Sequence, residues 1–163
     1  MAPFADALRA LNAMKAARVI DDYAVAGAMA LTFWSEPVAT YDLDVLVVLP
    51  HTNDSLVTLE RVYEWAREQG FSSKEEHLLI AGVPTQILPS PNALADEAIR
   101  DAADLEYEGV PVRVVRAEYL IALFCEPHAR TPKRRERVAG LLEGPNLDRE
   151  LLDAILERHG LAI

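Results

Sequence analysis

The sequence predicts an α+β protein, close to the α/β type, in which a small mixed sheet is flanked by helices and followed by a helical C-terminal tail. Three observations lead to this prediction. Apolar residues recur at helical spacing near the N-terminus, short apolar segments typical of strands fill the middle, and only helical patterns follow residue 116. Because 163 residues suit a single domain, we predict a core over residues 1–116 and a helical extension over residues 117–163, packed together as one compact unit.

The first half of the chain alternates helices and strands. The predicted elements are a helix over 4–18, a strand over 23–25, a helix over 28–33, a strand over 43–49 and a helix from Leu56 to just before Gly70. Asp21-Asp22 turns the chain, Gly27 opens the second helix and Pro37 ends it. The unbroken apolar run over 43–49 is typical of a strand covered on both faces. The polar residues 52–55 offer caps for the helix that follows.

The second half contains two pairs of strands and then helices. The predicted elements are strands over 77–80 and 84–88, a helix over 94–103, strands over 105–107 and 110–115, and helices over 117–125, 132–143 and 148–159. Turns at Ala81-Gly82 and Glu108-Gly109 make each strand pair a hairpin. Gly144-Pro145 and Gly160 act as helix stops.

Composition restricts the class of protein. A formal net charge of −10 argues against indiscriminate binding to nucleic acid or to an anionic membrane, although a local basic patch remains compatible with it. No apolar run approaches the length of a membrane span, and the amphipathic N-terminus, with Asp6 and Arg9, is not expected to be a secretory signal. Cys125 is the single cysteine, which excludes a disulfide framework and fits a reducing cytoplasm.

The candidate site is the acidic pair Asp42 and Asp44. Residues two apart on a strand project to the same face, so the carboxylates point together while Leu43 faces the core. Two such carboxylates repel each other unless a cation lies between them, and Mg²⁺ prefers one or two carboxylates together with substrate phosphates. A bare D-x-D motif is more often two solvated acids at the start of a strand. The apolar strand that follows, and the helix that Gly27 opens upstream, favour metal-assisted phosphoryl transfer.

This arrangement resembles a known fold. A glycine turn, about a dozen residues and then D-x-D on a strand is similar to the signature of the nucleotidyltransferase fold of the polymerase-beta superfamily. A finer resemblance is to small bacterial nucleotidyltransferase-like proteins related to AbiEii-type toxins. The blocks that carry it are YAVAGAMA…FWSEPVATYDLDVLV, PTQILPS…LADEAI, VPVRVV…EYLIAL and PKRRERV, and they extend over nearly the whole chain.

The resemblance implies transfer of a nucleoside monophosphate from an NTP to an acceptor hydroxyl, with Mg²⁺ or Mn²⁺ as the metal and RNA or protein among the possible acceptors. Asp42 and Asp44 would bind the metal, and Thr40 would help to set them. The nucleotide-binding positions would be Ala26, Gly27, Ala28, Thr40 and Lys133. This division of roles agrees with the chemistry, because phosphoryl transfer is accelerated mainly by positioning and charge stabilisation. The NTP, the acceptor and the oligomeric state stay open.

The chain departs from the family pattern at four places. Either Ala26-Gly27 or Gly27-Ala28 stands where the family has a glycine pair, so one of the two close backbone approaches to phosphate carries an extra methyl group. Gln86 falls where a third carboxylate is expected, and it binds Mg²⁺ poorly and cannot take a proton. Glu36 or Glu76 remain open as substitutes in space. The other two departures are Phe124, at a position that is often lysine, and Arg134, at a position that is often aspartate.

Other chemistry-bearing residues allow two interpretations. Five of the 16 basic residues lie within eight positions, namely Arg130, Lys133, Arg134, Arg135 and Arg137. They could steer an NTP or an RNA acceptor, or form a solvated helix face with local partners. The four histidines show no ligand spacing and are expected to be ordinary surface or boundary residues. Trp34 and Trp65 are expected to pack in the core, and Cys125 to be a buried structural thiol.

Three functions therefore compete. The first is an Mg²⁺-dependent nucleotidyltransferase, plausible as the toxin-like half of a bacterial defence pair. The second is a catalytically degraded protein of the same fold that binds a nucleotide or a partner, for example as an antitoxin, which the substitution at Gln86 favours. The third is a D-x-D glycosyltransferase, ranked last because the chain has little room for separate donor and acceptor domains.

Overall fold

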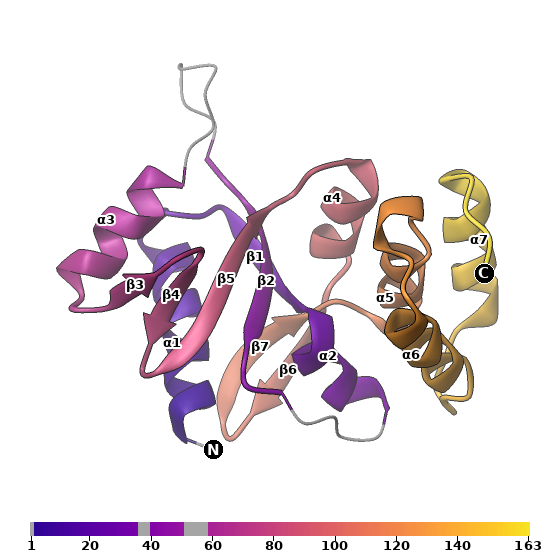
Figure 1. Cartoon of the computed structure of the whole chain (residues 1–163), viewed down its shortest axis with the longest axis horizontal. Helices are drawn as coiled ribbons and strands as arrows, with labels where there is room; N and C mark the ends of the chain where they lie inside the picture. The colour runs from indigo at the N-terminus through magenta and orange to yellow at the C-terminus, as the bar shows by residue number, and fades with distance from the viewer. Residues whose placement is uncertain (1, 36–39, 51–58) are drawn as a thin grey trace.

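A seven-stranded mixed sheet organises the residues described by the computed structural model, which are 2–35, 40–50 and 59–163 (Figure 1). The strands are β1 (Asp22–Ala26), β2 (Leu43–Val48), β3 (Ser72–Lys74), β4 (His77–Ile80), β5 (Val83–Pro89), β6 (Ala103–Tyr107) and β7 (Val110–Val114). The helices are α1 (Ala2–Ala16), α2 (Gly27–Trp34), α3 (Glu60–Glu68), α4 (Ala93–Arg100), α5 (Ala117–Phe124), η1 (Pro127–Ala129), α6 (Pro132–Leu142) and α7 (Arg149–Arg158). The strand order is β3-β4-β5-β2-β1-β7-β6.

β2 is the middle strand, as its unbroken apolar run predicts. It pairs antiparallel with β1 and parallel with β5, and β1 pairs parallel with β7. Parallel pairing requires cover on both faces, and the burial agrees, because Leu43, Val45 and Val47 are fully buried while Leu46 on the alternate face is also buried.

The two faces of the sheet are covered by different helices. The hydroxyl of Tyr23 donates to the Asn12 side chain at 2.6 Å, which places α1 over the face that carries Tyr23 and Val25. The opposite face carries Ala24 and Leu46, and it is covered by α2 and α4, which contact β1 and β2. Asp44 follows the alternation of β2 and belongs to this second face.

The three C-terminal helices lie together beside this face (Figure 1). α5 packs against α6 and α7, and it also contacts α2 and α4. The predicted boundary between residues 116 and 117 falls in the short connection from β7 to α5. The division into a core and an extension stays a prediction.

Most predicted elements are confirmed, and some boundaries were wrong. The two hairpins are present as β4 with β5 and β6 with β7. The helix predicted over 94–103 ends at Arg100, because β6 already begins at Ala103. Pro37, the polar residues 52–55 and the predicted helix start at Leu56 lie outside the described residues. Within the described ranges, no helix combines the length and apolar character that crossing a lipid bilayer would need.

Two short elements were not predicted. β3 is a three-residue edge strand whose side chains are all exposed, so it carries no apolar alternation from which a strand could be inferred. η1 is a single turn that begins at Pro127, one residue after its cap Glu126. β3 adds an edge strand to the sheet beside β4, and η1 lies outside the sheet.

Candidate active site

The acidic pair lies at the N-terminal end of the central strand β2. Leu43, the first residue of the strand, is fully buried, whereas Asp42 is exposed and Asp44 is half-buried. The two carboxylates line one open cleft of about 300 Å³. The residues around this cleft are Ala28, Thr40, Tyr41, Asp42, Asp44, Lys133 and Arg137. The structure therefore brings together six of the residues singled out from the sequence, with Arg137 from the basic run among them, and it adds Tyr41.

Gly27 is required at its position for two separate reasons. Its backbone is left-handed, with φ of +60°, a conformation that favours glycine. A Cβ at this position would also lie 2.5 Å from Asp44 Oδ2, well inside the contact distance. Asp44 is held in this place because Ala26, the last residue of β1, pairs with it across the sheet. The glycine turn and the second carboxylate thus form one packed unit.

The start of α2 offers backbone N–H groups at the cleft. Its N-cap residue, Ala26, has no side-chain acceptor, so that side chain caps none of the N–H groups in the first turn. Ala28 lines the cleft while Ala26 is buried. Of the two possible alignments of the glycine pair, the structure therefore favours Gly27-Ala28, and the methyl group at the cleft wall is that of Ala28. Thr40 donates its hydroxyl to the backbone carbonyl of Asp42 at 3.0 Å, which fixes the chain just before β2.

The electrostatics of Asp44 favour a bound cation. Burial raises the pKa of the Asp44 carboxyl, and the negative charge of Asp42 raises it further. The positive charges of His77, Arg134 and Arg137 oppose these effects. Since the net shift is upward, the Asp44 carboxylate is destabilised in its charged form, and a divalent cation beside it would relieve that cost.

The position beside Asp44 on the neighbouring strand holds Gln86. The parallel register of β2 and β5 pairs these two residues directly. Gln86 Nε2 donates to Glu76 Oε2 at 3.5 Å, which places the Glu76 carboxylate beside this position. Glu36, the other substitute considered, lies outside the described residues. In the parts of the chain that the structure describes, no group of three or more acidic, histidine or cysteine side chains could hold a metal.

The donor set fits one divalent cation. Mg²⁺ is commonly held by one or two carboxylates and completes its shell with water and substrate phosphates. Asp42 and Asp44 supply two carboxylates on one cleft wall, and Gly27 leaves the space beside Asp44 Oδ2 free of a side chain. A second ion would need a further carboxylate where Gln86 stands. The residues therefore match a single-metal site.

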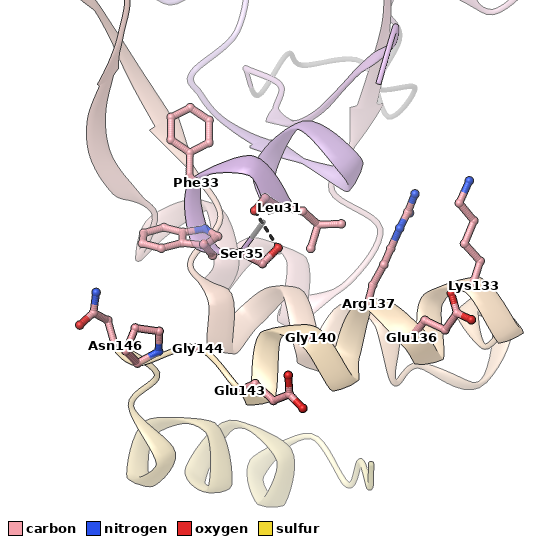
Figure 2. A pocket seen from close by; sticks show the side chains of 12 residues that line it. Leu31, Phe33, Ser35, Lys133, Glu136, Arg137, Gly140, Glu143, Gly144 and Asn146 are labelled. Atoms are coloured by element: carbon pink, nitrogen blue, oxygen red, sulfur yellow. Dashed lines mark hydrogen bonds between the residues drawn. The ribbon is translucent and has the colours of Figure 1, made fainter. Parts of the chain in front are cut away.

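Two cations from α6 face the carboxylates across the cleft. Lys133 and Arg137 are four positions apart on the helix, which places them on the same side. Figure 2 shows their side chains extending next to each other from one end of α6. Among the described residues, neither side chain has a hydrogen bond or ion pair with another side chain, so both charges are available to a ligand.

The remaining members of the basic run serve other places. Arg130 donates to the backbone carbonyls of Cys125 and Ala162, at 3.1 and 2.5 Å. Arg134 donates to the carbonyl of Ala129 at 2.8 Å, although its charge still reaches Asp44. Arg135 lines a separate hollow with Cys125. The run therefore does not form one continuous basic face.

One residue near the cleft has no signal in the sequence, and others behave as predicted. His77 is half-buried, as expected of a boundary residue, and from β4, two strands away in the sheet, it is one of the groups that lower the pKa of Asp44. Only the three-strand register reveals this, because the sequence spacing gives no signal. Cys125 is buried, as predicted, and burial raises the pKa of its thiol. Trp34 is half-buried and donates its indole N–H to the carbonyl of Val115 at 2.7 Å.

A strand, a glycine-opened helix and a D-x-D strand in a mixed sheet define the nucleotidyltransferase fold, and comparison with solved structures agrees. The chain is similar to an antigenic nucleotidyltransferase-like protein from Paracoccidioides brasiliensis, with a TM-score of 0.58, 14% identity, and coverage of 96% of this chain and 87% of that one.

It is also similar to ANT(2″)-Ia. The crystal structure of ANT(2″)-Ia in complex with adenylyl-2″-tobramycin gives a TM-score of 0.54 at 16% identity, over 94% of this chain and 95% of that one. The solution structure of the same antibiotic-resistance factor gives 0.51 at 16% identity, over 96% and 90%. No protein-family model matches the chain, and no curated protein matches its sequence. These likenesses show the fold.

Proposed function

We propose that the protein is a nucleotidyltransferase that moves a nucleoside monophosphate from an NTP to an acceptor hydroxyl and depends on Mg²⁺ or Mn²⁺. One observation carries the proposal. Asp44 packs against the left-handed Gly27 turn, and Asp42 and Asp44 line a single cleft with Lys133 and Arg137. The nucleotidyltransferase fold of the chain supports it.

Each part of the cleft has a distinct role in this proposal. Asp42 and Asp44 hold the metal, which when bound neutralises the charge on the substrate phosphates. The first N–H groups of α2 and the Lys133 ammonium bind the β- and γ-phosphates. Arg137 can bind two phosphate oxygens at once through its planar guanidinium group. The protein supplies no nucleophile, because positioning and charge stabilisation are enough for this reaction class.

The acceptor and the biological setting belong to the same proposal. A neighbour of the same fold holds adenylyl-2″-tobramycin, a nucleotidylated small molecule, so a small-molecule acceptor joins RNA and protein as a candidate. The resemblance to AbiEii-type toxins suggests a toxin-like role in a bacterial cytoplasm. Induced expression should then arrest bacterial growth, and Asp42→Asn should relieve the arrest.

A second function is favoured by one specific observation. Gln86, and not a carboxylate, is paired with Asp44 on β5. The same cleft could therefore bind an NTP with its metal and release no pyrophosphate, as in a nucleotide-binding or partner-binding module. Calorimetry with ATP, GTP, CTP and UTP in the presence of Mg²⁺, run beside a pyrophosphate assay, separates the two functions.

The direct test replaces each carboxylate by its amide. Asp42→Asn and Asp44→Asn should each lower NTP-dependent pyrophosphate release by about 10²- to 10³-fold, because each removes a metal ligand without changing the side-chain shape. Asp153→Asn is the matched control, since Asp153 is exposed on α7 and remote from the cleft residues. Full activity in either cleft variant would refute the assignment.

A further inference from the structure

A long groove continues from the acidic cleft along α6. It encloses about 850 Å³ and shares Lys133 and Arg137 with the cleft, so the two spaces adjoin at these side chains. Its other residues come from the C-terminal half of α2, from α6 and from the segment after α6 (Figure 2). A nucleotide bound by the cleft would therefore have its phosphates at one end of this groove.

One face of α6 forms the floor of the groove. The lining residues of this helix and its end are Lys133, Glu136, Arg137, Gly140, Glu143 and Gly144, which are spaced three and four apart. From the first to the last of them the helix rises by about 16 Å, enough for a ligand of two or three rings. Figure 2 shows the two cations at one end of this face and Gly144 and Asn146 at the other.

The sign of the charge changes along the groove. The end nearest the cleft carries Lys133 and Arg137 with Glu136 between them on the helix, and Glu143 lies farther along. Within the described residues, neither of these glutamates has an ion pair that would neutralise it. An anionic nucleotide thus meets positive charge first, and anything bound farther along meets carboxylates.

A buried carboxylate marks the far end. Glu118 lines an adjoining hollow of about 150 Å³, which shares Phe33, Trp34, Gly144, Pro145 and Asn146 with the groove. Its side chain is 6% exposed, and its interaction from outside its own helix is a long one, 3.4 Å from the Asp148 N–H. Burial raises the pKa of Glu118, since so little compensates the charge. Arg116 also lines the hollow, but its Nε donates to the Asp101 carbonyl at 2.7 Å.

The opposite wall supplies apolar surface. Phe33 and Trp34 are half-buried and line both the groove and the hollow. The hydrogen bond from the Trp34 indole to Val115 fixes that ring in place. The Phe33 ring extends away from α6 (Figure 2) and packs edge-on with Tyr107, so the fixed aromatic surface of the groove is Trp34. An aromatic ring beside carboxylates suits a ring-shaped ligand with positive charge, because amines bind carboxylates and rings cover aromatic faces.

We infer that this groove is the acceptor site, and that the acceptor is a small polyhydroxylated molecule with protonated amines. This inference rests on the proposed function and deepens it, because it assigns the acceptor class to a place in the fold. A nucleic-acid acceptor would bring phosphates against Glu143 and Glu118, where the charges repel.

Gly140 allows the groove to be filled without disturbing the fold. A Cβ built on it meets no heavy atom within 4 Å, and the residue is helical, so a larger side chain enters the groove. Gly140→Met should therefore block the groove and also favour the helix. Ala139→Met is the matched control, because Ala139 is exposed on the same helix and does not line the groove.

The test measures binding without NTP or metal. In a Trp65→Phe background, the fluorescence of Trp34 reports on the groove. It is titrated with the β-1,4-linked glucosamine dimer and with its N,N′-diacetyl form, which has the same free ring hydroxyls without the positive charges. We expect saturable binding of the amine form at millimolar concentrations and binding at least about tenfold weaker for the acetylated form. Gly140→Met, and Glu136→Gln with Glu143→Gln, should weaken the amine form by about tenfold, while Ala139→Met should not.

Several results would overturn the inference: no saturable binding of the amine form, equal binding of both sugars, or equal behaviour of Gly140→Met and Ala139→Met. Tighter binding of a single-stranded RNA decamer that Gly140→Met weakens would replace it with a nucleic-acid acceptor. The proposed function is tested separately, by measuring NTP-dependent pyrophosphate release by the wild type. Amine binding without such release would refute the proposed function alone, and release without amine binding would refute the inference alone.

Discussion

Gly27→Ala is the substitution for which the structure makes the sharpest prediction. The new methyl group would lie 2.5 Å from Asp44 Oδ2 and 3.2 Å from its Cγ, so the carboxylate must move. The backbone must also keep φ near +60°, which costs a residue with a Cβ about 1–2 kcal/mol. Together these effects should lower the free energy of unfolding by roughly 2–3 kcal/mol. For a chain of this size, that corresponds to a fall in Tm of about 4–12 °C.

Gly27→Ala should reduce the affinity for metal more strongly than it reduces the stability of the fold. If Asp44 turns away from Asp42, the metal loses one of two carboxylates or their common orientation, and Mn²⁺ affinity should fall by about 10- to 100-fold. Electron paramagnetic resonance of free Mn²⁺ measures the affinity, and differential scanning calorimetry measures Tm. Both are recorded on folded protein below the transition of the variant.

Gly160→Ala is the matched control for backbone strain. Gly160 has nearly the same left-handed φ, +64°, but a Cβ there meets nothing within 4 Å. This control should lose about 1–2 kcal/mol of stability and keep the Mn²⁺ affinity of the wild type. If Gly27→Ala bound Mn²⁺ like the wild type, or if Gly160→Ala lost equal affinity, the packed unit of Gly27 and Asp44 would not be the metal site.

Three further predictions concern the cleft. Lys133→Ala and Arg137→Ala should each weaken calorimetric NTP binding by about 10- to 100-fold, since each removes a charged hydrogen bond, whereas Arg135→Ala, in a separate hollow, should leave it unchanged. Asp44→Asn should raise Tm at pH 7 without metal. The pKa of Asp44 is raised in the folded state, so its protonated form stabilises the fold below the unfolded pKa, and this stabilisation is lost as pH rises through the folded pKa. The neutral amide avoids that loss. The gain should shrink as pH falls through the range where Asp44 is protonated, and a gain independent of pH would contradict the argument. Gln86→Glu should place a third carboxylate beside Asp44. The affinity for Mn²⁺ or the number of ions bound should then rise, and the Tm of the metal-free protein should fall. Unchanged metal binding would exclude this position as a ligand site.

The local part of the fold was accessible from the sequence. The strand at Tyr23, the turn at Gly27 and the strand after Asp42 are encoded by residues within one continuous stretch, and the structure contains all three. The pairing of Gln86 with Asp44 was also expected, because the family resemblance aligned that strand next to the D-x-D strand. Local patterns suffice wherever neighbours in sequence are neighbours in space.

The remaining features depend on packing between distant segments. Nothing in the basic run distinguishes Arg137, in the cleft, from Arg135, in another hollow, because the difference is set by the rotation of α6 against α2. Glu118 has the pattern of an exposed first-turn acid, yet α5 is buried between its neighbours and the carboxylate is buried with it. The effect of His77 on Asp44 likewise requires the register of three strands.

The cleft joins two parts of the chain that are made at different times. The carboxylates come from residues 42 and 44 at the start of β2, and the cations come from residues 133 and 137 in α6. Chains grow from the N-terminus at about 5–20 residues per second, so a nascent protein has its acidic pair well before it has the two cations that face it. Under the proposed function, an unfinished chain on the ribosome would bind an NTP more weakly than the completed protein, and full activity would begin only once α6 is made.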